Sequence, residues 1–298
     1  MKTLTKPQQI RPYSLDDPST RGVERGRLLF KGLMETGVDI GTRLLDVGCG
    51  FGGLSISYAK MGKTSFALDA DPRNIEVVKS RLRSGEHGPG NIFPVSASAL
   101  RIPLATDSVD LALMIGVVEW LGYSDPSRRV SDVQTSALRE VCRVIRPGGA
   151  LIVGTKNRLF PRYFWSDAQL KKPLLNLLPR QGANWLSTRL YGHEYRGYVY
   201  SYWGWQRLFR KAGFVVSQPL VPIFTYQYPL LLAKPWRRIK MNGNIESVLE
   251  RLPDDVQTSA VKSGFPSGRT AYYRILSSLH LLGLGAGCFM FVCEKPAH

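Results

Sequence analysis

Apolar and polar residues are arranged in blocks along the first half of the chain, and the spacing within each block separates strands from helices. Short apolar runs that break at a glycine or at polar residues predict buried strands, the first of them RLLDVG at 43–48. Four more such runs follow, at 64–71, 91–98, 108–118 and 150–157. Segments with helical spacing of their apolar residues lie at 22–36, 52–62, 72–85 and 131–145. Strands that alternate with helices predict an α/β fold, in which helices cover both faces of a parallel sheet.

The pattern changes after Asn157. Residues 158–200 are rich in Tyr, Trp, Arg and Pro and are typical of an insertion. A helix over 201–214 and a strand over 215–221 resume the alternation, and a second irregular stretch follows at 222–270. We therefore expect an N-terminal arm and helix (1–37), a core (38–157), an insertion and lid region interleaved with a core helix and strand (158–270, with 202–218), and a final helix and strand (271–298).

One stretch near the C-terminus, ILSSLHLLGLGAGCFMFVC at 275–293, is long and uncharged enough to be considered as a membrane span. It contains His280, three glycines and two serines, and it ends in the strand-like FMFVC. A buried helix, a glycine turn and a final strand explain it better than a span does. The first residues of the chain have no apolar core, so they do not predict a signal peptide.

The formal net charge of +17 is high for a chain with an ordinary apolar fraction of 44%. Residues 44–157 carry 13 Lys and Arg against 11 Asp and Glu, whereas residues 158–298 carry 19 against 7. The basic character therefore belongs to the C-terminal half. Such a charge favours an anionic partner, which leaves nucleic acid, a membrane surface and an acidic substrate open.

The cysteines and histidines give no sign of a metal or of disulfides. Cys49, Cys142, Cys288 and Cys293 form no C-x-x-C pair, and the chain has only four histidines. We expect no metal site, and reduced thiols fit a cytoplasmic protein.

The sequence LLDVGCGFGG at 44–53 predicts a glycine-rich ligand-binding loop, and two kinds of ligand have to be distinguished. Gly48, Gly50 and Gly53 have the G-x-G-x-x-G spacing of a dinucleotide-binding loop. A dinucleotide brings a pyrophosphate, which binds helix N–H groups and is repelled by a nearby acid. Here Asp46 stands two residues before the first glycine. A carboxylate at this point argues against an NAD-dependent oxidoreductase and suits S-adenosylmethionine, which carries a sulfonium and an ammonium and no phosphate.

This loop resembles motif I of the class I S-adenosylmethionine-dependent methyltransferases, and the chain is similar to their methyltransferase type 11-like domain. Further segments resemble the family in order and spacing: FALDAD, SALRIPLATDSVDLALM, IGVVEWL and LREVCRVIRPGGALIVGTKN. The resemblance covers about residues 40–157, and more loosely 202–218 and 288–296. It implies a Rossmann-like, doubly wound, mostly parallel seven-stranded sheet with an antiparallel last strand, plus the aromatic and basic insertion.

The resemblance also implies a cofactor, S-adenosylmethionine, and a set of residues that bind it. Asp69, at the end of the second strand, would accept hydrogen bonds from both ribose hydroxyls. The family's acid that contacts the adenine amino group falls on Ser98 here, so Ser98 and the Ala99 N–H would serve instead. The implied cofactor-binding residues are Asp46, Gly48, Cys49, Gly50, Asp69, Ala70, Ser98, Ala99, Ile115 and Gly116.

Two residues are candidates for the chemical step. Glu119 follows the fourth strand, so we expect it to face the acceptor, with a solvated acid at a helix start as the alternative. His193, in YGHEYRGY, is a candidate base for a hydroxyl proton, with a surface histidine bonded to backbone as the alternative. Methyl transfer is a direct displacement, so alignment of the two reactants can supply most of the rate without a base.

The second half of the chain is where we expect the acceptor to bind. Residues 157–186 resemble a segment of bacterial methyltransferases associated with glycan or lipid-linked biosynthesis, in which a histidine often stands at the position of Gln169. A dense aromatic group predicts a lid that also shapes the acceptor pocket: Tyr191, Tyr195, Tyr198, Tyr200, Tyr202, Trp203 and Trp205. We expect a small-molecule, sugar or lipid-linked acceptor, methylated on oxygen.

Three alternatives stay open at this level. Residues 222–240 pair apolar and aromatic residues with Lys234, Arg237, Arg238 and Lys240, so the protein is either peripheral to an anionic membrane or has a solvated basic edge. A nucleic-acid methyltransferase would suit the charge, although IGVVEW stands where an N-P-P-Y-type tetrad would follow the fourth strand. A catalytically degenerate partner protein would suit Ser98 and the lack of an obvious base.

Overall fold

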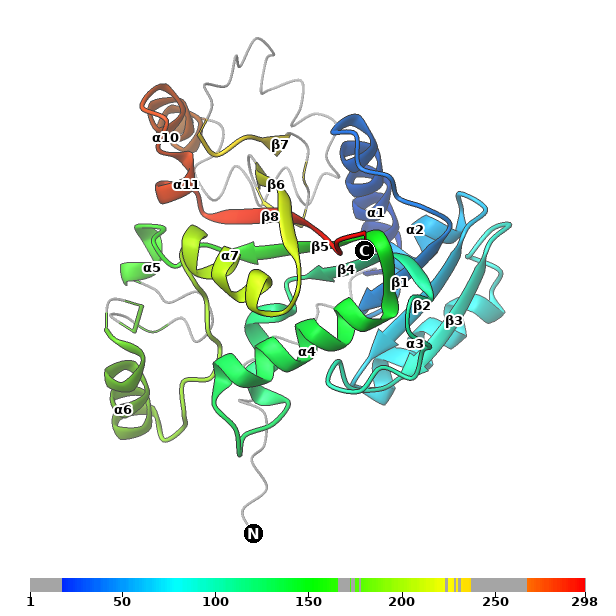
Figure 1. Cartoon of the computed structure of the whole chain (residues 1–298), viewed down its shortest axis with the longest axis horizontal. Helices are drawn as coiled ribbons and strands as arrows, with labels where there is room; N and C mark the ends of the chain where they lie inside the picture. Colours follow the sequence, from blue (N-terminus) through cyan, green and yellow to red (C-terminus); the bar gives the residue numbers. More distant parts are fainter. Residues whose placement is uncertain are drawn as a thin grey trace.

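The computed structural model describes residues 18–165, 172, 175–176, 178–222, 225–227, 229, 232–236 and 267–297. Within them the chain forms an eight-stranded sheet of order β3-β2-β1-β4-β5-β8-β6-β7 (Figure 1). The strands are β1 (Arg43–Val47), β2 (Thr64–Asp69), β3 (Asn91–Ser96), β4 (Val109–Ile115), β5 (Ile145–Lys156), β6 (Val215–Pro222), β7 (Leu232–Ala233) and β8 (Cys288–Glu294). The helices are α1 (Pro18–Glu35), α2 (Gly53–Ala59), α3 (Pro72–Arg83), η1 (Val118–Tyr123), α4 (Val130–Val144), α5 (Arg162–Trp165), α6 (Arg180–Tyr191), α7 (Tyr202–Lys211), α10 (Ser267–Ser278) and α11 (Leu282–Gly285).

The predicted α/β class and doubly wound sheet are confirmed, with one strand more than expected. Strands β1 to β5 pair in parallel, and β8 is antiparallel to both β5 and β6. The eighth strand, β7, is only two residues long and pairs with the end of β6. It comes from the stretch 222–270, whose irregular composition gave no strand signal.

Alternate residues of the central strands face opposite layers of helices. Leu45 and Val47 of β1 belong to a core cluster shared with α4 and α7. Leu44 belongs to a second cluster, shared with α1 and α2. This period of two explains why the strands read as continuous apolar runs in the sequence. Figure 1 shows α4 and α7 together in front of the sheet, and α5 and α6 at the opposite end of the molecule from β2 and β3.

The predicted helix over 131–145 ends one residue early in the structure. α4 stops at Val144, and the chain enters β5 at Ile145. The pairing of β4 with β5 shifts register between Val109 and Leu111, opposite the segment Pro147-Gly148-Gly149, which lies inside β5 as an irregularity. A Cβ on Gly149 would lie 2.7 Å from the Asp110 carbonyl oxygen, so the close approach of the two strands depends on this glycine.

Residues 275–293 form the end of α10, then α11 and β8, so the expected final strand is confirmed and a short helix stands where the glycine turn was expected. β8 is buried, but α10 is not a fully buried helix, since the side chain of Ile275 is 58% exposed. Across the described residues, none of the helices combines the length and apolarity that crossing a bilayer requires. Residues 1–17 of the predicted N-terminal arm and helix (1–37) lie outside the described residues, as do Gln169, Arg237, Arg238 and Lys240.

Helices α1 and α2 approach each other through glycines. A Cβ on Gly53 would lie 2.5 Å from the backbone of Gly22, and one on Gly26 would lie 2.4 Å from the Cβ of Ser57. The third glycine of the loop motif is therefore needed for helix packing, because no side chain fits between the two backbones. This contact fixes α1 beside the helix that follows the loop.

We expect Gly53→Ala to lower the free energy of unfolding by about 1–3 kcal/mol, the usual cost of overpacking. Chemical denaturation of the two proteins measures this difference. The control is Gly182→Ala in α6, where the nearest atom to an added Cβ would be 3.8 Å away, so stability should stay equal or rise slightly. Equal stabilities of Gly53→Ala and the parent protein would contradict this account of the contact.

Candidate active site

The glycine loop lies at the point where the strand order reverses. β1 has β2 on one side and β4 on the other, so the crossovers run to opposite faces and leave a crevice at the carboxyl ends of β1 and β4. Gly48 has a φ of +69°, and a Cβ there would lie 2.6 Å from Val117, just after β4. Its N–H and that of Cys49 both donate to the Leu68 carbonyl (2.7 and 3.0 Å). These contacts hold the loop between β2 and β4, and its first glycine, Gly48, has no side chain to cover the backbone.

Asp69 connects the end of β2 to this loop. Its Oδ2 accepts a hydrogen bond from the Gly50 N–H (2.9 Å), and its Oδ1 accepts one from the Asp71 N–H (2.8 Å). The side chain is half-buried. A carboxylate has about four acceptor positions, so it retains capacity for two hydroxyl donors in the crevice. Asp71 has the separate task of capping α3.

The turn after β3 reaches the same place. The Ala97 N–H donates to the Asp69 carbonyl (3.1 Å), and Ser98 Oγ accepts from the Leu100 N–H (3.2 Å). Since the Ser98 hydroxyl is an acceptor in that bond, its proton remains available to donate. Ala99 is buried and Ala70 is exposed. The structure therefore brings Ser98 to the side of Asp69.

Asp46 is buried beneath the loop, with 3% of its surface exposed. Ser55 of α2 donates to its Oδ2 (2.9 Å). Burial raises the pKa of Asp46 to about 6, although the Ser55 hydrogen bond and the positive charge of Arg25 act in the opposite direction. A buried carboxylate without a full counter-charge is stabilised by a cationic ligand nearby. The negatively charged phosphates of a dinucleotide would not stabilise it.

Comparisons with known proteins agree with this geometry. A model of a methyltransferase domain matches residues 45–153. The chain is 32% identical over 149 residues to a ubiquinone biosynthesis O-methyltransferase of Methylobacterium sp. (strain 4-46), covering 49% of this chain and 53% of that protein. It is also 32% identical over 115 residues to a malonyl-[acyl-carrier protein] O-methyltransferase of Serratia marcescens, covering 39% and 38%.

The fold has a counterpart among solved structures. A SAM-dependent methyltransferase from Methanosarcina mazei superimposes with a TM-score of 0.52 at 14% identity, covering 89% of this chain and 98% of that one. Residues 45–153 therefore match a methyltransferase domain, and the chain has a fold like that of a solved SAM-dependent methyltransferase. The cofactor of that family is S-adenosylmethionine. The chain spans about half the length of the curated O-methyltransferases it matches.

Glu119 of the methyltransferase domain is fully buried rather than solvated. It lies on η1, directly after the loop that follows β4, and Thr155 Oγ1 donates to its Oε2 (3.1 Å). The alternative of a solvated acid at a helix start is therefore wrong. Burial, and next the charge of Glu119, raise the pKa of the Tyr226 hydroxyl well above its usual value.

His193 lies in a different part of the molecule. It follows α6, stacks near Tyr191 at a ring distance of 6.4 Å, and its carbonyl accepts from Ser187 Oγ (2.9 Å). This region has its own small core of Leu175, Ala183 and Tyr195. The Nδ1 atom of His193 is buried without a hydrogen-bond partner among the described residues. This differs from the alternative of a histidine whose ring is hydrogen-bonded to backbone.

Three further expectations concern the lid, the thiol of the glycine loop and a metal site. Tyr202 and Trp205 on α7 are 5% and 0% exposed and belong to the sheet core, so they are not lid residues. Burial raises the pKa of the Cys49 thiol, and the charges of Asp46 and Asp69 raise it further, which keeps the thiol protonated. Among the described residues, no group of three or more His, Cys, Asp or Glu lies close enough together to hold a metal.

Sequence reasoning missed two residues of the site. Arg25 of α1 acts electrostatically on both Asp46 and Tyr226, and its Nε is buried with no hydrogen-bond partner among the described residues. Tyr226 lies over the ends of β4 and β5, since its side chain would be 3.0 Å from a Cβ on Gly116 and 3.1 Å from one on Gly154. Neither carries a local signal, because each reaches the site through contacts between distant segments.

The raised pKa of Asp46 predicts a specific dependence of stability on pH. A folded-state pKa near 6, above the ordinary value of 3.8, means that folding favours the protonated acid. Without ligand, this contribution to stability is fully present below about pH 4 and is lost as the pH rises through 6, by a total of the order of 3 kcal/mol. Asp46→Asn should remove the loss, so that the variant gains on the parent protein between pH 4 and pH 7. Denaturant unfolding across this range measures both, and parallel curves would refute the assignment.

Proposed function

We propose that the protein transfers the methyl group of S-adenosylmethionine to an oxygen of a small-molecule, sugar or lipid-linked acceptor. The observation that carries the cofactor choice is the pairing of two acids with the glycine loop. Asp69 is hydrogen-bonded to Gly50, and Asp46 is buried below it. Asp69 suits the two hydroxyls of a ribose, whereas the Asp46 carboxylate suits a ligand with cationic centres and would repel a pyrophosphate.

Each part of the cofactor has a matching group in this crevice. Asp69 would accept from the ribose hydroxyls, and Ser98 with the Ala99 N–H would contact the adenine. Gly48, Cys49 and Gly50 would provide the open backbone, with Ala70, Ile115 and Gly116 around it. Arg25 would pair with the carboxylate of the methionine part, because a guanidinium with a buried, unused N–H is a strong donor to a carboxylate.

The chain's own contribution to the chemical step would be alignment. When bound, S-adenosylmethionine would supply its sulfonium methyl group to the acceptor oxygen and would leave as S-adenosylhomocysteine. The hydroxyl proton must leave the oxygen. For that proton we prefer Glu119 to His193, because Glu119 follows the loop after β4, where the crevice lies, whereas His193 lies beyond α6.

Two facts support an oxygen acceptor held under the second half of the chain. The curated relatives in the comparison are named O-methyltransferases, one acting in ubiquinone biosynthesis and one on malonyl-[acyl-carrier protein]. The match to the methyltransferase-domain model ends at residue 153 within β5, so residues 158–270 lie beyond it, where this chain's own acceptor specificity would differ.

Calorimetric titration of the purified protein tests the cofactor. We expect saturable binding of S-adenosylmethionine and S-adenosylhomocysteine, and none of NAD. Binding of NAD in place of the other two would refute the proposal, as would failure of all three to bind. A subsequent screen of hydroxyl-bearing acceptors with labelled methyl donor then tests the oxygen acceptor separately.

A further inference from the structure

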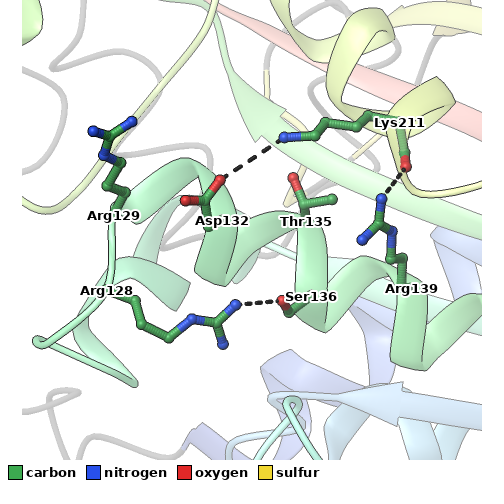
Figure 2. A pocket seen from close by; sticks show the side chains of 7 residues that line it. All are labelled: Arg128, Arg129, Asp132, Thr135, Ser136, Arg139 and Lys211. Atoms are coloured by element: carbon green, nitrogen blue, oxygen red, sulfur yellow. Dashed lines mark hydrogen bonds and ion pairs between the residues drawn. The ribbon is translucent and has the colours of Figure 1, made fainter.

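A basic groove lies on the outer surface of the α4–α7 layer, away from the residues of the glycine loop. Figure 2 shows the side chains that line it: Arg128, Arg129, Asp132, Thr135, Ser136, Arg139 and Lys211. The groove has a cavity volume of about 420 Å³. All of its lining residues come from α4, the two residues before it, and the last residue of α7.

The groove collects positive charge that the protein does not neutralise. Its lining contains four cationic side chains and one carboxylate. That carboxylate, Asp132, lies 3.8 Å from the Lys211 ammonium, and both side chains are about half exposed, so the pair is loose. Like charges held together at low ionic strength repel one another, and an anion bound among them would relieve that repulsion.

Two arginines of the groove use only part of their N–H groups in hydrogen bonds within the protein. Arg128 uses Nη2 on Ser136 Oγ (2.7 Å), and Arg139 uses Nη2 on the Lys211 carbonyl (3.3 Å), as the dashed lines of Figure 2 show. A guanidinium has five N–H donors, so most of each remains available in a planar fork that matches phosphate oxygens. These bonds hold the side chains along the groove rather than in free solution.

Hydrogen bonds from a neighbouring arginine also fix the backbone at one end of the groove. Arg196 donates to the carbonyls of Gly122 (2.7 Å), Asp125 (3.0 Å) and Arg128 (2.7 Å). It thereby fixes the loop that presents Arg128 and Arg129 at the start of α4. A preformed site loses less conformational entropy when a ligand binds.

The lining determines which anion would fit. It contains no aromatic side chain and no large aliphatic one, so it offers neither a stacking surface for a ring nor an apolar group for a bilayer. Asp132 and Arg139 are seven residues apart on one face of α4, which separates them by about 10 Å along the helix. A single phosphate is too small to contact both ends of such a groove.

We propose that this groove binds a ligand through two or more linked phosphate groups, as in a diphosphate or a phosphodiester backbone. Arg139 and Lys211 would bind at one end and Arg128 with Arg129 at the other. Lys211 would exchange its loose contact with Asp132 for the phosphate. This site is separate from the cofactor crevice and does not depend on the proposed methyl transfer.

The test is calorimetric titration of the full chain with inorganic pyrophosphate at low ionic strength. We expect binding that weakens by about tenfold or more in Arg139→Gln and in Lys211→Gln, since each removes a charged hydrogen bond. Asp132→Asn should bind more tightly, because it removes the competing carboxylate. The matched controls lie on α3: Arg83→Gln makes the same change of net charge as the first two variants, and Glu76→Gln makes the same change as Asp132→Asn. Both should leave the affinity nearly unchanged.

A second arm identifies the source of the phosphate groups. A short single-stranded DNA oligonucleotide that displaces pyrophosphate, with the same loss in the Arg139 and Lys211 variants, indicates a nucleic-acid backbone. Pyrophosphate binding without such competition indicates a small phosphorylated ligand. The proposal is wrong if pyrophosphate does not bind, if the α3 controls change its affinity as much as the groove variants do, or if only vesicles of phosphatidylglycerol bind in a groove-dependent way.

Discussion

Asp69→Ala should weaken the binding of S-adenosylmethionine by at least about 100-fold. Each hydrogen bond to a charged group contributes about 1.5–3 kcal/mol, and the variant would lose two to the ribose. It would also release the Gly50 N–H, whose bond to Asp69 Oδ2 keeps the loop in its present conformation. Titration calorimetry of the variant, with circular dichroism to confirm its fold, measures the loss.

Asp71→Ala is the matched control for this prediction. The two aspartates are two residues apart, but Asp71 accepts from the Arg73 N–H and caps α3. Its loss should cost about 1 kcal/mol of stability and leave the cofactor affinity within a few-fold. Equal losses of affinity in both variants would mean that the local fold, rather than the Asp69 carboxylate, is what matters.

Trp205→Ala should lower the free energy of unfolding by about 3–5 kcal/mol, the largest effect on stability that we predict. The side chain is fully buried, stacks on Phe209 at 6.0 Å, and donates from Nε1 to the Lys156 carbonyl (3.0 Å) at the end of β5. The substitution therefore leaves a cavity and also removes the hydrogen bond to the Lys156 carbonyl. Denaturant unfolding measures the change.

The neighbouring Trp203→Ala provides the comparison. Trp203 lies two residues earlier on the same helix but is 49% exposed, and its ring lies near those of Tyr202 and Trp236. We expect less than half of the effect of Trp205→Ala. If the two variants were equally destabilised, the division of α7 into a core face and an outer face would be incorrect.

Much of the central sheet could be predicted because its signals are local. Each parallel strand is a short run that breaks at a glycine or at polar residues, and the structure ends the strands within about three residues of the predicted ends, as with Arg43–Val47 and Thr64–Asp69. The place of Ser98 near Asp69 was implied by the resemblance to the methyltransferase family, and it fits the rule that the carboxyl ends of parallel strands share an edge. These inferences needed no knowledge of packing.

The parts that could not be predicted depend on contacts between distant segments. α6 (Arg180–Tyr191) contains Gly182 and exposes Trp185, so its apolar residues do not form the continuous stripe that would have marked a helix. Arg25 reaches Asp46 across the α1–α2 contact, and nothing in its local sequence indicates this. The burial of Glu119 likewise depends on Thr155, 36 residues later in the chain.

The glycine contact between α1 and α2 has a consequence for how small an autonomous version of this domain can be. Residues 45–153 match the methyltransferase family, yet Leu29, Phe30 and Leu33 of α1 fill the core beside Leu44 and Tyr58. A polypeptide cut at the family boundary would expose that apolar surface to water and lose Arg25 as well. The smallest unit able to fold and bind cofactor should therefore begin before Gly22, and α1 and α2 would have to be exchanged together in any chimaera between relatives.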